Sequence, residues 1–284
     1  MEMQTKAQTL AQAVDVGTDD VFAIVLRPQT ILDVEICGRK TSEWVEESVS
    51  QYQRRVVEVK KGDDIIGIVR DNVIAKKYCI VVYADTPLIT RDTIAQALSF
   101  VATYGHSAGQ LPRGWVFETE YVKNTKSIVS VTVPNLSEND FIVAYSMAQV
   151  ALITTYMRTR INESHMENGV QITDPYCVYI DADVHIGAGT RVAPGACITS
   201  GAKIGKNCDI GCGVVFCNFD GKEKHKITVG DNVFIGASSN LVAPLTVGNN
   251  ARIEPGSTIT NDVPADALAV ARARQAVKEN YKKD

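Results

Sequence analysis

The sequence predicts an α/β domain followed by a left-handed parallel β-helix built from hexapeptide repeats. Two observations lead to this prediction. Aliphatic residues recur every six positions over much of the second half of the chain, from Ile180 to Ile259. In the first half, short apolar runs typical of buried strands alternate with helical patterns. With 284 residues and 45% apolar composition, the chain is long enough for one or two domains with hydrophobic cores of their own.

The first half is expected to form a small α/β domain over roughly residues 20–135, after about twenty residues that we expect to lack order. The run IIGIVR, 65–70, is a short strand candidate. The run YCIVVYAD, 78–85, is almost continuously apolar and ends in an acid, which is typical of a buried parallel strand that delivers a carboxylate to a sheet edge. Thr90 is placed to cap the helix that follows. The segment GWVFETEYV, 114–122, is strand-like with an aromatic stripe.

Two further helices are expected on either side of the repeats. Ser137 and Asp140 have the spacing of a capping box, which predicts a helix from about Asn139 to Ser164 that Gly169 is placed to end. Pro264 is expected to begin a final helix with a basic tail. The expected organisation is therefore an α/β domain (1–136), a linking helix (137–168), the β-helix (169–263) and a C-terminal helix and tail (264–284).

The repeat defines two inward-facing positions in each hexad. The first is aliphatic or aromatic: Ile180, Ile186, Val192, Ile198, Ile204, Ile210, Phe216, Val229, Ile235, Leu241, Val247, Ile253 and Ile259. Two residues earlier stands a mostly small or β-branched side chain: Val178, Val184, Thr190, Ala196, Ala202, Cys208, Val214, Ile227, Val233, Ser239, Leu245, Ala251 and Ser257. Residues i and i−2 of a strand share a face, so both point into one narrow interior. Three hexads make one triangular coil, and stacked coils bury a continuous core.

This regularity makes an ordinary β-sandwich the weaker alternative. The repeat is broken once, because the step from Phe216 to Val229 is thirteen residues, one more than two hexads. We therefore expect a loop that leaves the coil within CNFDGKEKHK, 217–226.

Composition excludes several classes of partner. The net charge is −4 and the charges are scattered without a basic stripe, which argues against nucleic acid. The uncharged run 141–157 is shorter than a typical membrane span and contains polar residues, so no membrane segment is expected. The first ten residues lack the apolar region of a secretory signal. Seven cysteines without C-x-x-C spacing fit reduced thiols in the cytoplasm.

Two stretches carry a resemblance to a known family. One runs from INESHMENG, 161–169, through the repeats and contains CNFDG, 217–221, followed by Lys224; the other is YADTPLIT, 83–90. They resemble the bifunctional bacterial N-acetylglucosamine-1-phosphate uridyltransferase/glucosamine-1-phosphate acetyltransferase. The resemblance implies a homotrimer that binds acetyl-CoA in grooves between neighbouring β-helices. It also implies a reduced nucleotidyltransferase-like domain that joins UTP to a sugar phosphate with magnesium.

The resemblance also implies roles for individual residues. It places Asp85 as a magnesium ligand and Lys224 against a substrate phosphate. It places five residues along bound acetyl-CoA: Asn218, Phe219, Ala237, Pro255 and Arg272. The residues themselves leave alternatives open. Asp85 also suits a strand-end acid that caps a turn, Lys224 and Arg272 also suit solvated surface positions, and Asn218 also suits a loop-shaping role.

The sequence departs from the family at both sites. No glycine-rich phosphate loop precedes Asp85, and Tyr145 stands where the family has its second magnesium ligand. In the β-helix, the family's histidine base falls on Gly195. Four further substrate positions fall on Ile198, Asp209, His165 and Asp183. His225, beside Lys224 in the predicted loop, is the candidate for a substitute base.

These observations leave three hypotheses. The chain is an acyl-CoA-dependent transferase with an altered acceptor, a minimal sugar-1-phosphate nucleotidyltransferase, or a non-catalytic trimeric scaffold or regulatory relative. The surviving loop with Lys224 and Arg272 favours the first hypothesis, and YADTPLIT favours the second. The missing histidine and the missing phosphate loop favour the third.

Overall fold

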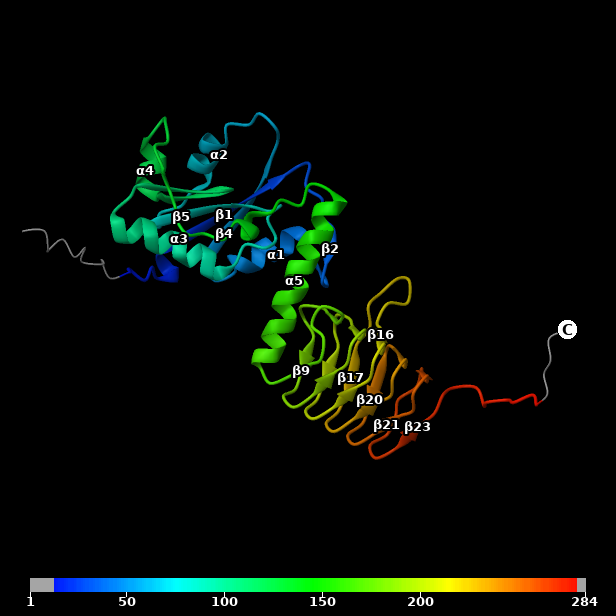
Figure 1. The fold of residues 1–284 in the computed structure, drawn as a ribbon. Helices are drawn as coiled ribbons and strands as arrows, with labels where there is room; N and C mark the ends of the chain where they lie inside the picture. Colours follow the sequence, from blue (N-terminus) through cyan, green and yellow to red (C-terminus); the bar gives the residue numbers. More distant parts are fainter. Residues whose placement is uncertain (1–12, 280–284) are drawn as a thin grey trace, which may run out of the picture. The chain divides into compact units, whose positions relative to one another are not determined.

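The computed structural model of the protein describes residues 13–279, which form two compact units divided between Thr154 and Thr155 (Figure 1). The first unit is an α/β domain and the second is the left-handed β-helix, so the predicted fold class is confirmed. The expected lack of order at the start of the chain lies, for residues 1–12, outside the described part. From residue 13 onward the segment follows the domain, and the backbone N–H of Val14 donates to Thr103 Oγ1 at 2.9 Å.

The first unit is built on a six-stranded mixed sheet in the order β4-β1-β5-β7-β6-β8. Strand β1 is parallel to β4 and β5, whereas β7 is antiparallel to β5. The strands of the sheet are β1 (Val21–Pro28), β4 (Gln53–Val59), β5 (Tyr78–Tyr83), β6 (Ala108–Leu111), β7 (Gly114–Glu118) and β8 (Val131–Thr132), and β2 (Glu35–Ile36) and β3 (Arg39–Lys40) form a separate hairpin. The helices are α1 (Thr41–Ser48), α2 (Ile65–Asn72), α3 (Arg91–Tyr104) and α4 (Thr119–Asn124), with 3-10 turns η1 (Thr18–Asp20) and η2 (Glu138–Phe141).

Helices cover both faces of this sheet, which explains why its central strands read as continuous apolar runs. Alternate residues of β1 belong to two different cores: Val21, Ala23 and Val25 to one, Phe22, Ile24 and Leu26 to the other. Side chains of α1 and α3 join the first core, and those of α2 and α4 join the second. The domain therefore has three layers, and the expected buried strand 78–85 and the Thr90-capped helix are confirmed as β5 and α3.

The expected strand at 65–70 is wrong, because these residues form helix α2. Asp64 caps it by accepting a hydrogen bond from the backbone N–H of Gly67 at 3.0 Å. The apolar residues Ile65, Ile66, Ile68 and Val69 then pack against the second core. A six-residue apolar run fits either element, and the capping aspartate was the available signal.

The linking helix also begins later than expected. Helix α5 spans Met147–Glu167, and it is Ser146 that caps it, with Oγ accepting from the backbone N–H of Gln149 at 3.3 Å. Residues 138–141 form η2 instead, and the carboxylate of Asp140 accepts a hydrogen bond from Thr93 Oγ1 at the start of α3. Gly169 follows the end of the helix in a left-handed conformation (φ 85°), as predicted.

The second unit stacks its short strands into three parallel sheets (Figure 1). We number them in the order in which the chain visits them. Sheet 1 contains β9 (Gln171–Ile172), β12 (Arg191–Val192), β15 (Asp209–Ile210), β18 (Phe234–Ile235), β21 (Arg252–Ile253) and β23 (Leu268–Ala269). Sheet 2 contains β10 (Tyr179–Ile180), β13 (Cys197–Ile198), β16 (Val215–Cys217), β19 (Asn240–Val242) and β22 (Thr258–Ile259). Sheet 3 contains β11 (His185–Ile186), β14 (Lys203–Ile204), β17 (Ile227–Val229) and β20 (Leu245–Val247).

The interior of the coils matches both predicted registers. The aliphatic series and the series two residues earlier are buried almost throughout and form one continuous core, with Ile186 partly buried against it. Partners on successive coils are 18 residues apart, as in Arg191 with Asp209. Within the described residues, no helix is long and apolar enough to cross a membrane.

The structure refines the break in the repeat and corrects the end of the chain. Phe216 on sheet 2 and Val229 on sheet 3 lie on consecutive sides of one coil, and partners across the break are 25 apart, as in Asp209 with Phe234. The break is therefore one hexad carrying a seven-residue insertion. The helix expected from Pro264 is wrong for residues 264–279, because 264–267 turn a corner into β23, which pairs with β21.

Candidate functional site

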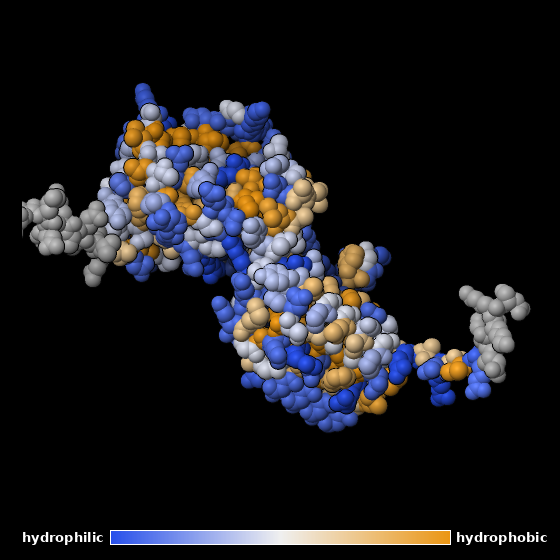
Figure 2. Space-filling view, in the orientation of Figure 1, coloured by the Kyte–Doolittle hydropathy of each residue, from blue (hydrophilic) through white to orange (hydrophobic). Residues whose placement is uncertain are grey.

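The insertion forms a loop, residues 218–226, between β16 and β17. It stands off the coils in Figure 1 and projects from the surface in Figure 2. Asn218 closes its base, because Nδ2 donates to the carbonyl of Ser200 at 2.8 Å and its own carbonyl accepts from the backbone N–H of His225 at 2.7 Å. Phe219, bridged to the backbone of Lys224, keeps 59% of its surface exposed. Asn218 thus shapes the loop, while Phe219 is left exposed beside it.

His225 is held by an aspartate of the same loop. Its Nε2 lies 2.8 Å from Oδ2 of Asp220, whose Oδ1 accepts the backbone N–H groups of Lys222 and Glu223, each at 2.8 Å. These hydrogen bonds, with the Glu223 amide contributing most, hold the pKa of Asp220 well below its ordinary value. Asp220 is therefore a carboxylate beside the His225 ring, and the pair has the base-and-orienter form found in proton-transfer sites.

Three of the predicted CoA-side residues gather at the corner between sheets 1 and 2. Ala237 and Pro255 occupy equivalent exposed positions of successive coils, and the backbone N–H of Gly256 donates to the carbonyl of Ala237 at 2.9 Å. Arg272 reaches back to the same place: Nη2 lies 3.8 Å from Oε2 of Glu254, and Cδ lies 3.8 Å from where a β-carbon on Gly256 would sit. We call Ala237, Pro255 and Arg272 the corner group.

The loop and the corner group lie at opposite ends of the strands of sheet 2. The corner group occupies the turns that enter this sheet from sheet 1, and the loop follows β16 where the chain leaves for sheet 3. One chain therefore presents the two sets of predicted residues on two different corners of its β-helix.

The positions at which this sequence differs from the family lie at the coil corners, on the coil strands and in the last turn of α5. Gly195 is exposed at the same corner as the corner group, with a left-handed backbone (φ 77°). Ile198 points into the core and is 1% exposed, so no side chain at this position faces a ligand here. Asp209 pairs with Arg191 at 2.7 Å, and Asp183 accepts the backbone N–H of Gly201 at 3.0 Å.

The remaining histidines of this unit are structural or peripheral. His165 lies in the last turn of α5, and its pKa is lowered by burial first and by His185 second. His185 is exposed on β11, as its outward register predicted.

In the first unit, Asp85 lies two residues beyond β5 and is 5% exposed. Arg113, from the turn between β6 and β7, donates from Nε and Nη2 to the two carboxylate oxygens of Asp85 at 2.7 and 2.6 Å. The guanidinium also covers the ring of Tyr83, 4.1 Å from its centroid. Tyr145 is 68% exposed, and its hydroxyl accepts from Gln149 Nε2 at 3.2 Å.

Sequence reasoning missed Arg113 and Asp220. Arg113 is 28 positions from Asp85, and only the pairing of β5 with β7 brings the two together. Asp220 belongs to the CNFDG motif and precedes Gly221, which is a turn signal. A turn at this point would have predicted that Asp220 faces the residues after the turn, among them His225.

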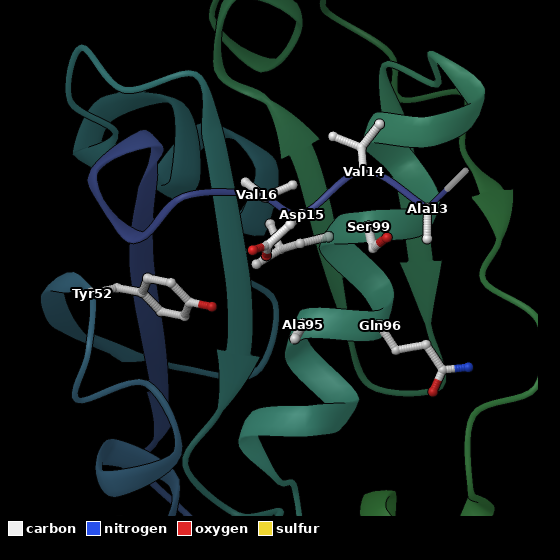
Figure 3. A pocket seen from close by; sticks show the side chains of 9 residues that line it. Ala13, Val14, Asp15, Val16, Tyr52, Ala95, Gln96 and Ser99 are labelled. Atoms are coloured by element: carbon white, nitrogen blue, oxygen red, sulfur yellow. The ribbon is translucent and has the colours of Figure 1, made fainter. Parts of the chain in front are cut away.

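A separate hollow of about 280 Å³ lies between residues 13–16, Tyr52 and helix α3 (Figure 3). Another of about 280 Å³ is formed by the last coil, residues 258–264 with 267–271. The first contains none of the predicted residues. The second ends at Ala271, next to the corner group's Arg272.

Comparison with known proteins supports the resemblance. Residues 226–261 match the family model described as bacterial transferase hexapeptide (six repeats). The chain is 32% identical over 247 residues to the bifunctional protein GlmU of Caldanaerobacter subterraneus subsp. tengcongensis, covering 57% of this chain and 54% of that protein. It is 35% identical over 210 residues to GlmU of Thermoanaerobacter pseudethanolicus, covering 44% and 46%. The chain thus spans about half the length of the curated relatives it matches.

Solved structures give weaker likenesses. A hexapeptide-repeat acetyltransferase of Vibrio cholerae O1 biovar eltor, complexed with acetyl coenzyme A, is 18% identical with a TM-score of 0.35 over 47% of this chain and 92% of that chain. Soybean serine acetyltransferase is 22% identical with a TM-score of 0.35 over 48% and 62%. Likenesses at these TM-scores carry no weight for fold or ligand. The sequence identities and the repeat show that this chain is similar to the bifunctional GlmU proteins over about half of their length.

Proposed function

We propose that the β-helix transfers an acetyl group from acetyl-CoA to the amine of an amino-sugar-like acceptor. The observation that carries the proposal is the corner group, because three residues that the resemblance assigns to CoA converge at one corner of the coils. Arg272 is suited to phosphate by its charge and planar donors. Its contact with Glu254 is long and half exposed, so it is available for exchange with a ligand anion.

The loop supplies the residues for the acceptor side of the same proposal. In this proposal Lys224 contacts a sugar phosphate, as the resemblance implies, and His225 replaces the histidine absent at Gly195. Asp220 holds Nε2 of His225, which leaves Nδ1 to accept a proton. The amine then attacks the thioester carbonyl, a C–N bond forms, the C–S bond breaks, and the amine proton passes to Nδ1 while the CoA thiolate leaves.

The proposed assembly is a homotrimer through the β-helix. Because the loop and the corner group lie on different corners of one chain, a groove lined by both requires the corner of a neighbouring copy. Light scattering of the full chain should give a mass about three times 30.9 kDa. A monomer at micromolar concentration would remove the groove from the proposal.

Binding of acetyl-CoA is tested by titration calorimetry on the full chain. Arg272→Gln should weaken binding about tenfold or more, since a charge-assisted phosphate contact is worth roughly 1.5–3 kcal/mol. Arg274→Gln, an exposed arginine two positions on, is the matched control. Equal affinities for the two variants would remove Arg272 from the site, and the absence of binding by the unaltered chain would end the proposal.

Turnover is best measured by mass spectrometry of the acetylated amino sugar, because the exposed thiols of Cys177 and Cys212 would consume thiol reagents. His225→Gln should lower kcat by about 10²–10⁴ with CoA affinity unchanged. If acetyl-CoA binds but no amino sugar is acetylated, the non-catalytic scaffold becomes the better function.

A further inference from the structure

The carboxyl edge of the N-terminal sheet is where the family resemblance places a magnesium ion, with Asp85 as its ligand. Magnesium requires several oxygen ligands at short, near-octahedral positions. In this chain both oxygens of the Asp85 carboxylate already accept hydrogen bonds from one guanidinium, at 2.7 and 2.6 Å. A positive group therefore stands where the cation would have to approach, and any metal would first have to displace it.

Arg113 is held in this position by the fold. It lies in the tight turn before Gly114, whose backbone approaches β5 so closely that a β-carbon there would lie 2.2 Å from the Val81 carbonyl oxygen. On its other side the guanidinium stacks on Tyr83. The turn, the ring and the carboxylate thus fix Arg113 from three directions, and its side chain is only 31% exposed.

Other side chains near this edge are engaged in contacts of their own, so Asp85 is the carboxylate on which a cation with water ligands would depend. The family's second ligand position is Tyr145, whose hydroxyl is engaged with Gln149. Two other acids that follow or end strands of this edge, Asp33 and Glu58, contact Arg27, and Asp140 accepts a hydrogen bond from Thr93 Oγ1. Among residues 13–279, no group of three or more His, Cys, Asp or Glu side chains is arranged to hold a metal ion.

We infer that Arg113 takes the place of the divalent cation at Asp85, so that this sheet edge is closed by an internal ion pair and binds no divalent metal there. The inference concerns the N-terminal domain and does not depend on acetyl transfer by the β-helix. The ion pair of Asp85 with Arg113 then stabilises the folded N-terminal domain, and this stabilisation does not depend on divalent metal in the solution.

Manganese is a suitable probe, because its electron paramagnetic resonance signal reports the bound fraction directly. The full chain and Asp85→Asn should bind manganese equally, with no site lost by the substitution. Arg113→Met leaves the Asp85 carboxylate without its guanidinium and should gain one manganese site. The double variant Arg113→Met/Asp85→Asn should lose that site again. Loss of a manganese site in Asp85→Asn alone would overturn the inference, as would a folded Arg113→Met that gains none.

Thermal unfolding in excess chelator tests the pair even if Arg113→Met fails to fold. Asp85→Asn should lower the Tm of the N-terminal unit by roughly 5 °C or more, since it leaves Arg113 without its partner. Glu47→Gln is the matched control, because Glu47 pairs with Arg91 on the surface at 2.5 Å with both side chains about half exposed. Equal Tm values for Asp85→Asn and Glu47→Gln would contradict the stabilising role.

Discussion

At the scale of single residues, the corner between sheets 3 and 1 shows that a coil can turn there without a glycine. Five stacked positions have left-handed backbones: Gly189, Asn207, Asn232, Asn250 and Asp266. Asparagine and aspartate tolerate this conformation better than other side chains with a β-carbon. They also connect the coils, because Asn232 Nδ2 donates to Asn250 Oδ1 at 3.1 Å and Asn250 Nδ2 donates to Asp266 Oδ1 at 2.8 Å.

Asn250→Ala should therefore lower the free energy of unfolding of the β-helix by about 1–2 kcal/mol, from the cost of a left-handed alanine and the loss of two exposed hydrogen bonds. Asn250→Gly is the matched variant, since it keeps the backbone freedom and loses only the hydrogen bonds, and it should cost about half as much. Denaturant titration measures both. Equal losses would mean that the backbone conformation contributes nothing.

At the scale of elements, one side chain fastens helix α5 to the first coil. Asn162 is 0% exposed, and its Nδ2 donates to the carbonyls of Pro175 at 2.8 Å and Val178 at 3.1 Å. Its Oδ1 has no hydrogen-bond partner within the described residues. The amide thus satisfies two backbone acceptors at the start of the coils while leaving one of its own atoms unpaired.

Asn162→Ala should destabilise the β-helix unit by about 1–3 kcal/mol, because two carbonyls lose their donor while the unpaired oxygen is removed with the side chain. Glu163→Ala, on the exposed side of the same helix, should change the free energy of unfolding by less than about 0.5 kcal/mol. Denaturant midpoints compare them. A loss as large in Glu163→Ala would point to helix propensity instead of the anchoring amide.

The end of α5 should also make this unit sensitive to acid. The folded-state pKa of His165 lies below its ordinary value of 6.5, by burial first and by the charge of His185 second. Above pH 6.5 the histidine is neutral in both states, and its contribution to stability is fully present. As the pH falls through 6.5 the unfolded chain takes up the proton first, so stability is lost.

His165→Gln should flatten this dependence. Tm measured from pH 8 to pH 5 should fall less steeply for His165→Gln than for the unaltered chain, whereas His106→Gln, in the other unit, should leave the slope unchanged. Identical slopes for all three would remove His165 as the source.

At the scale of the whole molecule, the two units have separately composed cores. The β-helix core draws its buried residues from positions 170–263, whereas the two cores of the α/β domain draw theirs from positions 21–141. Residues that share one hydrophobic core unfold together, and units with separate cores can unfold separately. The chain should therefore unfold in two steps.

Calorimetry should resolve two transitions that respond to different substitutions. Ile80→Ala and Ile235→Ala both truncate an isoleucine with 0% exposure, and each should cost its own unit about 2–5 kcal/mol. Each variant should lower one transition and leave the other in place. A single transition that both variants shift would show one cooperative unit.

The parts of the structure that the sequence predicts well are those with a local period. The repeat needs only neighbours six and eighteen residues away, so both inward registers were predicted position by position. The short run at 65–70 has no such period and forms a helix that Asp64 caps, whereas the segment after Pro264 is decided by the pairing of β23 with β21. The ion pair of Asp85 with Arg113 depends on strands far apart in the chain, which no local pattern reports.

The seven-residue insertion after Cys217 has an evolutionary consequence. The coils on both sides of the loop keep their strand register. The loop can therefore change in length and sequence during evolution without disturbing the β-helix. A lineage can then lose one chemistry and try another while its fold stays intact. Grafting loops of other lengths between Cys217 and Ile227 would sample that freedom directly.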